Sequence, residues 1–318
     1  MSYGKIYETT WWGNPIDGGW GDIYFDLTGT AETAFVFNVK TDNAGTSNDD
    51  QFTLPLISSF NGVTAEVDWG DGSTDTITAY NQPEVTHTYA SAGTYTIKIS
   101  NALRGFRFDS GGDRLKLLNI SNWGVLEING DNVFFGCANM TCTATDAPTI
   151  STTNLTRTFR NCSSFNGAIG NWDVSSVTTM AEMFNSASSF NQPLNSWDVS
   201  NVVIVTSMFA SATSFNQPLN SWNTGNINDF RNMFSRNDAF DQDISSWDVT
   251  NSGNFINFMF GSDGFSVANY DALLVGWESQ LVNNNISANF GGSKYTASSA
   301  AATARQALID DHNWTIVD

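Results

Sequence analysis

A repeat of constant length occupies the second half of this chain and limits what it can fold into. Four tryptophans, Trp172, Trp197, Trp222 and Trp247, follow one another at a step of 25 residues. The same pattern surrounds each of them, written FNQPLNSWDVSNV in the unit that begins at Phe190. A period in this range is typical of a solenoid, in which each unit buries its apolar face by stacking on its neighbours. We therefore expect the four tryptophans to form a structural ladder.

Within a unit, apolar residues first alternate and then recur at steps of three. Trp172 and Val174 are two residues apart, which is the spacing of side chains on one side of a β-strand. Val177, Met180 and Met183 follow with helical spacing. Ser175 stands between the two patterns, where a helix N-cap is expected. We predict one strand and one short α- or 3₁₀-helix per coil of about 25 residues.

The spacing of the repeated residues predicts where the repeat ends and where it begins. The Met-Phe pairs begin at residues 183, 208 and 233, but the last begins at Met259, one residue late. We therefore expect an extra residue near Ser252–Gly253. In the other direction, Phe134 lies 25 residues before Phe159, which extends the stack back to about residue 105. The asparagine that follows each repeated phenylalanine, such as Asn191, is expected to bond turn backbone and not a ligand.

At these residues the chain resembles a known family. The pattern FNQPLNSWDVSNV…MF is similar to the BspA-like leucine-rich repeat of bacterial surface proteins, which also occurs in phage-encoded proteins. The resemblance implies a right-handed solenoid, over residues 104–264, that is used for surface binding. It does not name a ligand.

Residues 31–103 alternate apolar and polar positions and predict a β-sandwich. Two motifs, VDWGDGSTDTI and HTYASAGTYTIKI, resemble the PKD-type immunoglobulin-like domain. This resemblance implies a spacer or binding module. Three carboxylates near the turn, Asp68, Asp71 and Asp75, raise the alternative of a Ca²⁺ site, but Asp-Gly is also what a hairpin turn requires. No metal is assigned, and His87 is expected to be packed or hydrogen-bonded in the core.

Residues 265–318 predict a helical cap with a final strand. Apolar residues from Tyr270 to Leu281 recur with helical spacing. A loop, NNNISANFGGSKYT, leads to a second helix whose start is expected to be capped by Thr296 or Ser298. The chain ends on WTIVD. We predict that this segment pairs with the edge of the repeat sheet as one more rung, because an open edge exposes unpaired backbone groups.

Composition excludes several classes of partner. Thirteen basic against 32 acidic residues give a net charge of −19, which argues against nucleic acid or an anionic membrane. No apolar run approaches the roughly 20 residues of a membrane span. Cys137 and Cys162 occupy equivalent places in adjacent units, and we expect a buried thiol stack in place of a disulfide, because parallel side chains often fail its dihedral requirement. With Cys142 they have no metal-site spacing.

Residues 1–30 form an aromatic N-terminal arm. It carries Trp11, Trp12, Trp20 and Tyr24 among glycines, without a regular period. One interpretation is a strand that packs on the following domain. The other is an assembly anchor that docks into another subunit, where Trp and Tyr are preferred contact residues. The opening lacks an apolar h-region, so we expect no signal peptide.

No catalytic constellation is found in the sequence. Neither histidine has an identifiable Ser or Cys partner, and most carboxylates recur once per unit. We therefore expect a non-enzymatic protein without a cofactor. A glycan-active enzyme is a remote alternative, because the spacing of a carboxylate pair is invisible in sequence.

Binding fits two settings. The first is a phage virion accessory or fibre-like protein, which presents the solenoid for host attachment from the virion surface. The second is a secreted adhesin on the bacterial cell surface, which needs an export signal. We favour the first. Its expected partners are other virion proteins through the N-terminal arm and a host surface glycan or protein, with several copies in the assembly.

Overall fold

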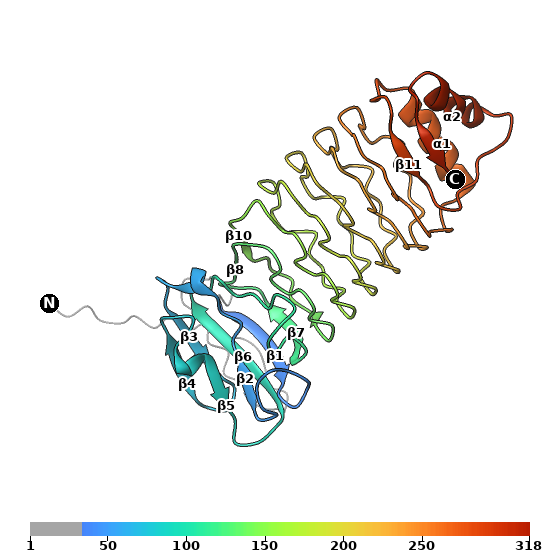
Figure 1. Cartoon of the computed structure of the whole chain (residues 1–318). Coiled ribbons are helices and arrows are strands. Elements are labelled where there is room, and N and C mark those ends of the chain that lie inside the picture. The colour runs from blue at the N-terminus through green and yellow to red at the C-terminus, as the bar shows by residue number, and fades with distance from the viewer. Residues whose placement is uncertain (1–33) are drawn as a thin grey trace, which may run out of the picture. The chain divides into compact units, whose positions relative to one another are not determined.

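The structure, a computed structural model, describes residues 34–318, which belong to one compact unit. The expected anchors Trp11, Trp12, Trp20 and Tyr24 lie outside the described residues. The described chain is β-rich, with several sheets, and has two α-helices near its C-terminal end (Figure 1).

The strands are β1 (Phe35–Lys40), β2 (Gln51–Thr53), β3 (Ala65–Asp68), β4 (Thr74–Ile77), β5 (Thr86–Thr88), β6 (Thr94–Asn101), β7 (Leu117–Asn122), β8 (Glu127–Ile128), β9 (Thr141–Cys142), β10 (Thr149–Ile150), β11 (Ser287–Asn289) and β12 (Thr315–Val317). The helices are the 3₁₀-helices η1 (Ser58–Phe60) and η2 (Pro83–Val85) and the α-helices α1 (Val267–Glu278) and α2 (Ala300–Asp310).

The N-terminal part is built on a six-stranded sheet of order β4-β3-β6-β1-β7-β9, with β2 and β5 as a separate pair. Phe35, Phe37 and Val39 alternate along β1 and are fully buried, which confirms the predicted strand. On β6, Ile97 lies opposite Phe37 and Ile99 opposite Phe35. The apolar positions of both strands therefore face one core.

Strand β7 joins this sheet to the repeats. It pairs antiparallel with β1 on one side and parallel with β9 on the other. Strands β8 and β10 also pair in parallel. The sheet and the first units thus share a strand, and buried residues from Phe35 to Trp314 form a single core cluster.

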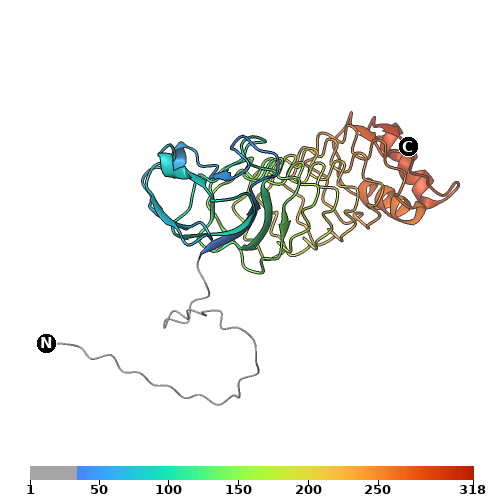
Figure 2. The ribbon, with the colours of Figure 1, turned by 90° about the horizontal axis from the view of Figure 1, so that it is seen from below.

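Successive repeat units lie side by side beyond this junction (Figures 1 and 2). Parallel β-bridges join them at a constant step, through Asn154, Thr179, Ile204, Asp229 and Asn254. Further backbone hydrogen bonds lie beside these bridges. In many of them a backbone N–H of one unit donates to a carbonyl of the next unit. Each unit is thus held to its neighbours by the backbone.

The prediction of one strand and one short helix per unit is wrong. From residue 151 to residue 264 the structure has no helix, and its β-structure consists of bridges. The Trp172 N–H donates to the Ile169 carbonyl at 3.1 Å, so the chain turns where a strand was expected. Where the helix was expected, Glu182 has a φ of 57°, and a left-handed residue interrupts a right-handed helix.

Left-handed backbone recurs twice in each unit and follows the period of the repeat. The first row has φ between 53° and 57° and consists of Arg157, Glu182, Ser207, Asn232 and Asn257. The second has φ between 57° and 70° and consists of Asn161, Ser186, Ser211, Arg236 and Gly261. Such a conformation costs a non-glycine residue roughly 1–2 kcal/mol. Bonds to the next unit offset this cost, as where Ser186 N donates to Ala210 O at 2.8 Å.

The predicted extra residue near Ser252–Gly253 is absent. Asn254 bridges to Asp229 in the same register as the bridges of the earlier units. The Phe258 carbonyl accepts the N–H of a phenylalanine in the preceding unit at 2.9 Å, as the methionine carbonyls of earlier units do. Phe258 therefore stands where earlier units have methionine, and Met259 stands where they have phenylalanine. The backbone keeps the period, and only the side chains exchange places.

Phenylalanine rings form the continuous stacks of the core. One column has centroids 5.5–5.8 Å apart and runs through Phe134, Phe159, Phe184, Phe209 and Phe234. The other has centroids 5.8–6.3 Å apart and runs through Phe165, Phe190, Phe215 and Phe240. Within a unit the two columns touch at 3.8–4.1 Å. The four units that begin their turns between residues 156 and 231 each contribute two rings to one aromatic core.

The four repeat tryptophans are buried, but hydrogen bonds hold them more uniformly than ring contacts do. Trp197, Trp222 and Trp247 each donate the indole N–H to a carbonyl of the preceding unit, at 2.9–3.0 Å. Trp222 stacks on Trp247 at 6.4 Å, whereas Trp197 packs on Phe184 at 6.3 Å. Trp172 differs, since its buried N–H has no acceptor among residues 34–318.

Because Trp197 has an acceptor for its indole N–H and Trp172 has none among residues 34–318, replacing each by phenylalanine should lower the unfolding free energy by different amounts. Trp197→Phe removes the indole donor from the Ile169 carbonyl, which keeps the Trp172 N–H, and we expect a loss of roughly 0.5–1.5 kcal/mol in unfolding free energy. Trp172→Phe removes a buried N–H that has no partner among residues 34–318, so it should cost clearly less stability. Urea unfolding of the two variants measures the difference. Equal losses would show that the indole bonds contribute nothing.

Helix α1 occupies the place of another unit. The Trp277 indole donates to the Ile244 carbonyl at 3.2 Å, which is the bond that the repeat tryptophans make. The Asn269 amide donates to the Asp241 carboxylate at 2.8 Å and continues the row of asparagine bonds. The predicted helical stripe is too long, because α1 ends at Glu278 and Leu281 is 91% exposed.

The WTIVD segment is a further parallel rung, as predicted, but it lies one place further out. In β12, Ile316 pairs with Ala288 of β11, and Ala288 bridges to Phe255 of the last unit. The segment NNNISANFGGSKYT, which was expected to be a loop, therefore supplies β11, and β11 lies between the last repeat unit and β12. The predicted caps Thr296 and Ser298 are wrong as well, because the hydroxyl of Ser299 accepts the first N–H groups of α2.

Candidate functional surface

One surface of the stack changes from unit to unit. We name it the turn face; it consists of the short turn after each bridge, residues 156–161, 181–186, 206–211, 231–236 and 256–261. The first position of the turn carries, in chain order, Thr156, Ala181, Thr206, Arg231 and Ile256. The fifth carries Arg160, Asn185, Ala210, Ser235 and Phe260. Varied side chains on a repeated backbone are typical of the binding face of a repeat protein.

The turn face also collects the positive charge of the repeats. Between residues 128 and 264 there are four basic side chains, Arg157, Arg160, Arg231 and Arg236, and all of them lie in these turns. The chain as a whole has a net charge of −19. Local charge on this face therefore differs from that of the molecule.

The N-terminal half of the turn face is closed by ion pairs. Arg157 bonds Glu182 at 2.7 Å, and Arg160 bonds the other oxygen of the same carboxylate. The Arg160 guanidinium also lies 5.3 Å from the centroid of the Phe135 ring. The two guanidinium groups share this one carboxylate and link neighbouring units.

The C-terminal half is open. Arg231 is paired with Asp229, at 2.6 Å. Arg236 is exposed, and its guanidinium makes no hydrogen bond or ion pair among the described residues. Ile256 and Phe260 are 47% and 46% exposed, high values for large apolar side chains in a stack whose other such residues are mostly buried. This half has charge and apolar area that the described residues 34–318 do not use.

The segments between these turns carry repeated structural hydrogen bonds. Asp173 and Asp198 each accept the backbone N–H two residues later, and bonds from the serine there lower the pKa of both carboxyls. The Asn166 side chain accepts the Asn191 N–H at 2.9 Å, and the next units repeat this bond. The structural interpretation of these asparagines is confirmed.

The three carboxylates of the WGDG turn bind separate donors. Asp68 accepts the Gly70 N–H, and Asp75 accepts the indole N–H of Trp69. Asp71 accepts the Ser73 hydroxyl and lies 2.9 Å from Nε2 of His87, whose ring stacks on Trp69 at 4.7 Å. His87 is thus packed and hydrogen-bonded, as predicted. Within residues 34–318 no three acidic, His or Cys side chains converge as metal ligands.

Asp71 gives this turn a predicted pH dependence. The hydrogen bond from Ser73, followed by that from His87, lowers the pKa of Asp71 to about 2. The ionised carboxylate therefore contributes stability at pH 4 and above, which is lost as the pH falls towards 2. We expect Asp71→Asn to reduce the drop in unfolding free energy between pH 4 and pH 2. Denaturant unfolding at each pH measures it, and parallel curves for both proteins would contradict it.

A buried ion pair is the main feature that sequence reasoning missed. Asp113 and Lys116 are 1% and 0% exposed and lie between the N-terminal sheet and the first units. A lysine between two leucines, in RLKLL, was the available signal. The pair holds the loop between β1 and β2.

The cysteines are free thiols, and Cys137 and Cys162 are fully buried. Burial raises the pKa of both, and it raises the pKa of Cys142 to about 11. A high thiol pKa disfavours the reactive thiolate. The expected thiol stack is thus compatible with the structure, in which none of the three is bridged.

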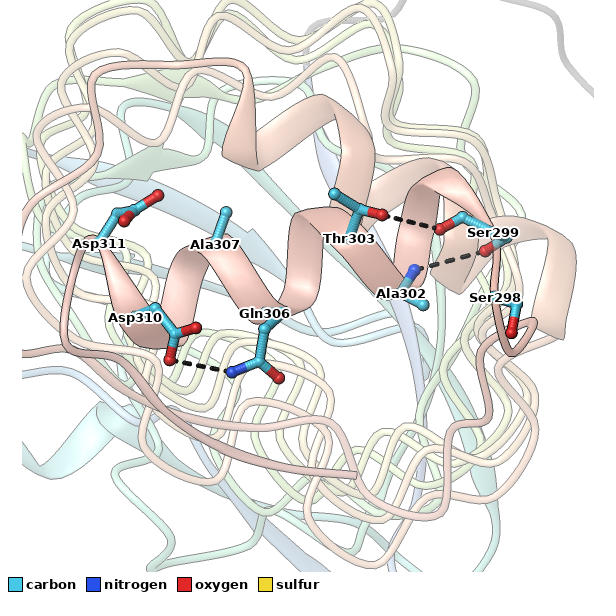
Figure 3. A pocket seen from close by; sticks show the side chains of 8 residues that line it. All are labelled: Ser298, Ser299, Ala302, Thr303, Gln306, Ala307, Asp310 and Asp311. Atoms are coloured by element: carbon cyan, nitrogen blue, oxygen red, sulfur yellow. Dashed lines mark hydrogen bonds between the residues drawn. The ribbon is translucent and has the colours of Figure 1, made fainter.

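A shallow hollow of about 550 Å³ runs along α2 from Ser298 to Asp311 (Figure 3). Its polar groups are used within the helix, where Gln306 donates to Asp310 at 2.9 Å and Ser299 forms the N-cap. No convergent set of polar groups remains there. Separately, neither α1 nor α2 is long and apolar enough to cross a membrane, and the search covered residues 34–318.

Comparison with known proteins agrees with this repeat geometry. The model of the family described as "Mycoplasma protein of unknown function, DUF285" matches three overlapping stretches, residues 128–237, 153–277 and 207–300, which together exceed half of the chain. The chain belongs to this family. The third stretch of the DUF285 match extends through α1 and β11, which is where the structure places substitutes for further units. No curated protein and no solved structure gives a significant match.

Proposed function

We propose that this DUF285 protein is a non-enzymatic attachment protein that presents its turn face to a partner on another surface. The contrast between two kinds of position in the repeat carries the proposal. The aspartates and asparagines between the turns recur in nearly every unit and accept backbone N–H groups, whereas the fifth position of the turn differs in every unit, and Ile256 and Phe260 of the turn face are about half exposed. A scaffold needs the first kind of position, and recognition needs the second.

The proposal includes a finer description of the fold. Constant parallel bridges support a right-handed leucine-rich-repeat solenoid of the BspA-like surface type over residues 104–264. The strand pairs around the WGDG turn support a PKD-type sandwich over residues 31–103. Residues 265–318 are then the cap.

The proposed setting is the surface of a phage particle, with the arm of residues 1–30 as its anchor and a host surface as the target. A bacterial cell surface is the alternative. Antibodies against the chain, applied to intact particles and to intact cells, separate the two by electron microscopy. Labelled cells and unlabelled particles would assign the chain to the cell surface.

The proposed role of the arm predicts that a protein without it is not incorporated into particles. Deleting residues 1–28 is expected to leave a folded protein that no longer incorporates into particles, because Trp11, Trp12 and Trp20 are the proposed contacts. Circular dichroism checks the fold, and immunoblotting of purified particles measures incorporation. Normal incorporation of the truncated protein would exclude the arm as the anchor.

Attachment is tested with the labelled full chain and a panel of intact bacterial cells. A turn-face variant carries Arg231→Ala, Ile256→Thr and Phe260→Ser. The control variant carries Asp173→Asn, Asp198→Asn and Asp248→Asn, which lie outside the turn face. We expect the first variant to lose cell binding and the second to keep it. Equal binding by both would contradict the proposal, and release of sugar products from the cells would favour the enzyme alternative.

A further inference from the structure

The C-terminal end of the turn face combines a cation that has no partner among residues 34–318 with an exposed ring. The Arg236 N–H donates to the Phe260 carbonyl at 2.9 Å, so the two residues lie in adjacent units. The Arg236 stem lies over Gly261, where a Cβ atom would come within 3.4 Å of its Cγ. The guanidinium has no partner among the described residues, and about half of Phe260 is exposed. We name Arg236, Phe260 and Ile256 the C-terminal patch.

A groove continues this patch across the last rungs. It has a volume of about 250 Å³ and is lined by the apolar Ile256, Ala288 and Val317 and by the short polar Asn257, Ser287, Asn289 and Thr315. Enclosed small-molecule sites are larger, roughly 300–1,000 Å³. An open groove of this size therefore suits part of a chain that lies across it. Amide and hydroxyl side chains offer both donors and acceptors to such a chain.

We propose that the C-terminal patch and its groove bind an anionic saccharide chain. The inference rests on the proposed attachment function and adds the class of ligand. A carboxylate or sulfate binds the Arg236 guanidinium, whose fork of N–H donors matches both groups. The apolar face of a sugar ring packs on Phe260. The hydroxyls of the next sugars bond the polar side chains of the groove.

Charge favours an acidic ligand over a basic or neutral one. The chain carries 32 acidic residues, so a basic partner has many places to bind and no need of this patch. Arg231, Arg157 and Arg160 are each paired with a carboxylate, whereas Arg236 is left without one among the described residues. Salt screens the remaining charge of the molecule beyond about 8 Å at physiological ionic strength, so contacts at the patch decide the binding.

Calorimetric titration of the full chain with oligogalacturonate, dextran sulfate and neutral dextran tests the inference. We expect binding of at least one anionic probe, weakening with added salt, and no binding of dextran. Arg236→Ala should lower the affinity roughly tenfold, the effect of one charge-assisted contact. Phe260→Ser should lower it as well. Lys40→Ala on β1 removes an equal charge away from the patch and should change nothing. The two anionic probes distinguish carboxylate from sulfate recognition.

Three results would overturn the inference. One is equal affinity of Arg236→Ala and the parent chain for the anionic probes. Another is cell binding that depends on the turn face without measurable binding of any anionic probe; this would leave the attachment function intact. The third is cell binding abolished by protease treatment of the cells and dependent on Arg236, which would identify a protein partner. Loss of turn-face dependence altogether is a failure of the proposed function itself.

Discussion

Replacing Lys116 by methionine is expected to lower the free energy of unfolding by roughly 3–5 kcal/mol, the usual cost of breaking a buried ion pair. The Lys116 ammonium is fully buried and lies 3.9 Å from the Asp113 carboxylate. It donates to the carbonyls of Asn48 and Gln51 at 2.8 and 2.9 Å and to the Ser47 hydroxyl at 2.8 Å. Methionine fills similar space but leaves these oxygens and the carboxylate uncompensated.

Asp113 completes the arrangement from the other side. Its carboxylate accepts the N–H groups of Thr46, Ser47 and Thr53 at 2.8–3.0 Å. A Cβ atom at Gly45 would lie 2.4 Å from the carboxylate, which explains the glycine there. The pair therefore holds the loop between β1 and β2 against the segment that begins the repeats. We expect Lys116→Met to loosen this loop as well as to lower stability.

The exposed pair Lys40–Asp42 is the matched control. Its atoms are closer, at 2.6 Å, but both side chains are 41% exposed. Exposed pairs contribute at most about 1 kcal/mol, so Lys40→Met should change stability little. Urea unfolding gives the free energies, and hydrogen exchange of residues 45–53 reports the loop. Similar losses for both substitutions would mean that burial is not the source of the effect.

Phe209→Ala is the second substitution with a large expected loss, roughly 3–5 kcal/mol for a buried phenylalanine. The Phe209 ring lies between Phe184 at 5.5 Å and Phe234 at 5.8 Å, and it touches Phe215 at 4.0 Å. Its removal opens a cavity in the middle of the column. Each unit is stabilised through its neighbours, so the defect should weaken units on both sides.

Ile204→Ala in the same unit is the control, because Ile204 is 37% exposed and contributes to the surface of the stack instead of the core. We expect a much smaller loss from it. Denaturant unfolding followed by tryptophan fluorescence measures both, since Trp197 and Trp222 lie close to the substituted unit. A Phe209→Ala protein as stable as Ile204→Ala would show that the phenylalanine column does not hold the units together.

The period and the buried positions of the stack can be read from the amino-acid sequence alone. Trp172, Trp197, Trp222 and Trp247 are all buried at the predicted step, because every unit repeats the same burial on its neighbour. The apolar alternation of β1 and the extra rung of β12 were also readable. In each case the signal is a hydrophobic pattern, which burial imposes directly on the residues concerned.

The local conformation of the units and the candidate site depend on contacts that exist only in the folded chain. The Trp-x-Val spacing fits a strand and a turn equally well, and bonds from the neighbouring units select the turn. The unpaired state of Arg236 among the described residues depends on which side chains the stack brings near it. The groove beside Ile256 exists because β11 and β12, distant in sequence, follow the last unit as rungs. These features arise from contacts between distant segments, and no local pattern in the sequence encodes them.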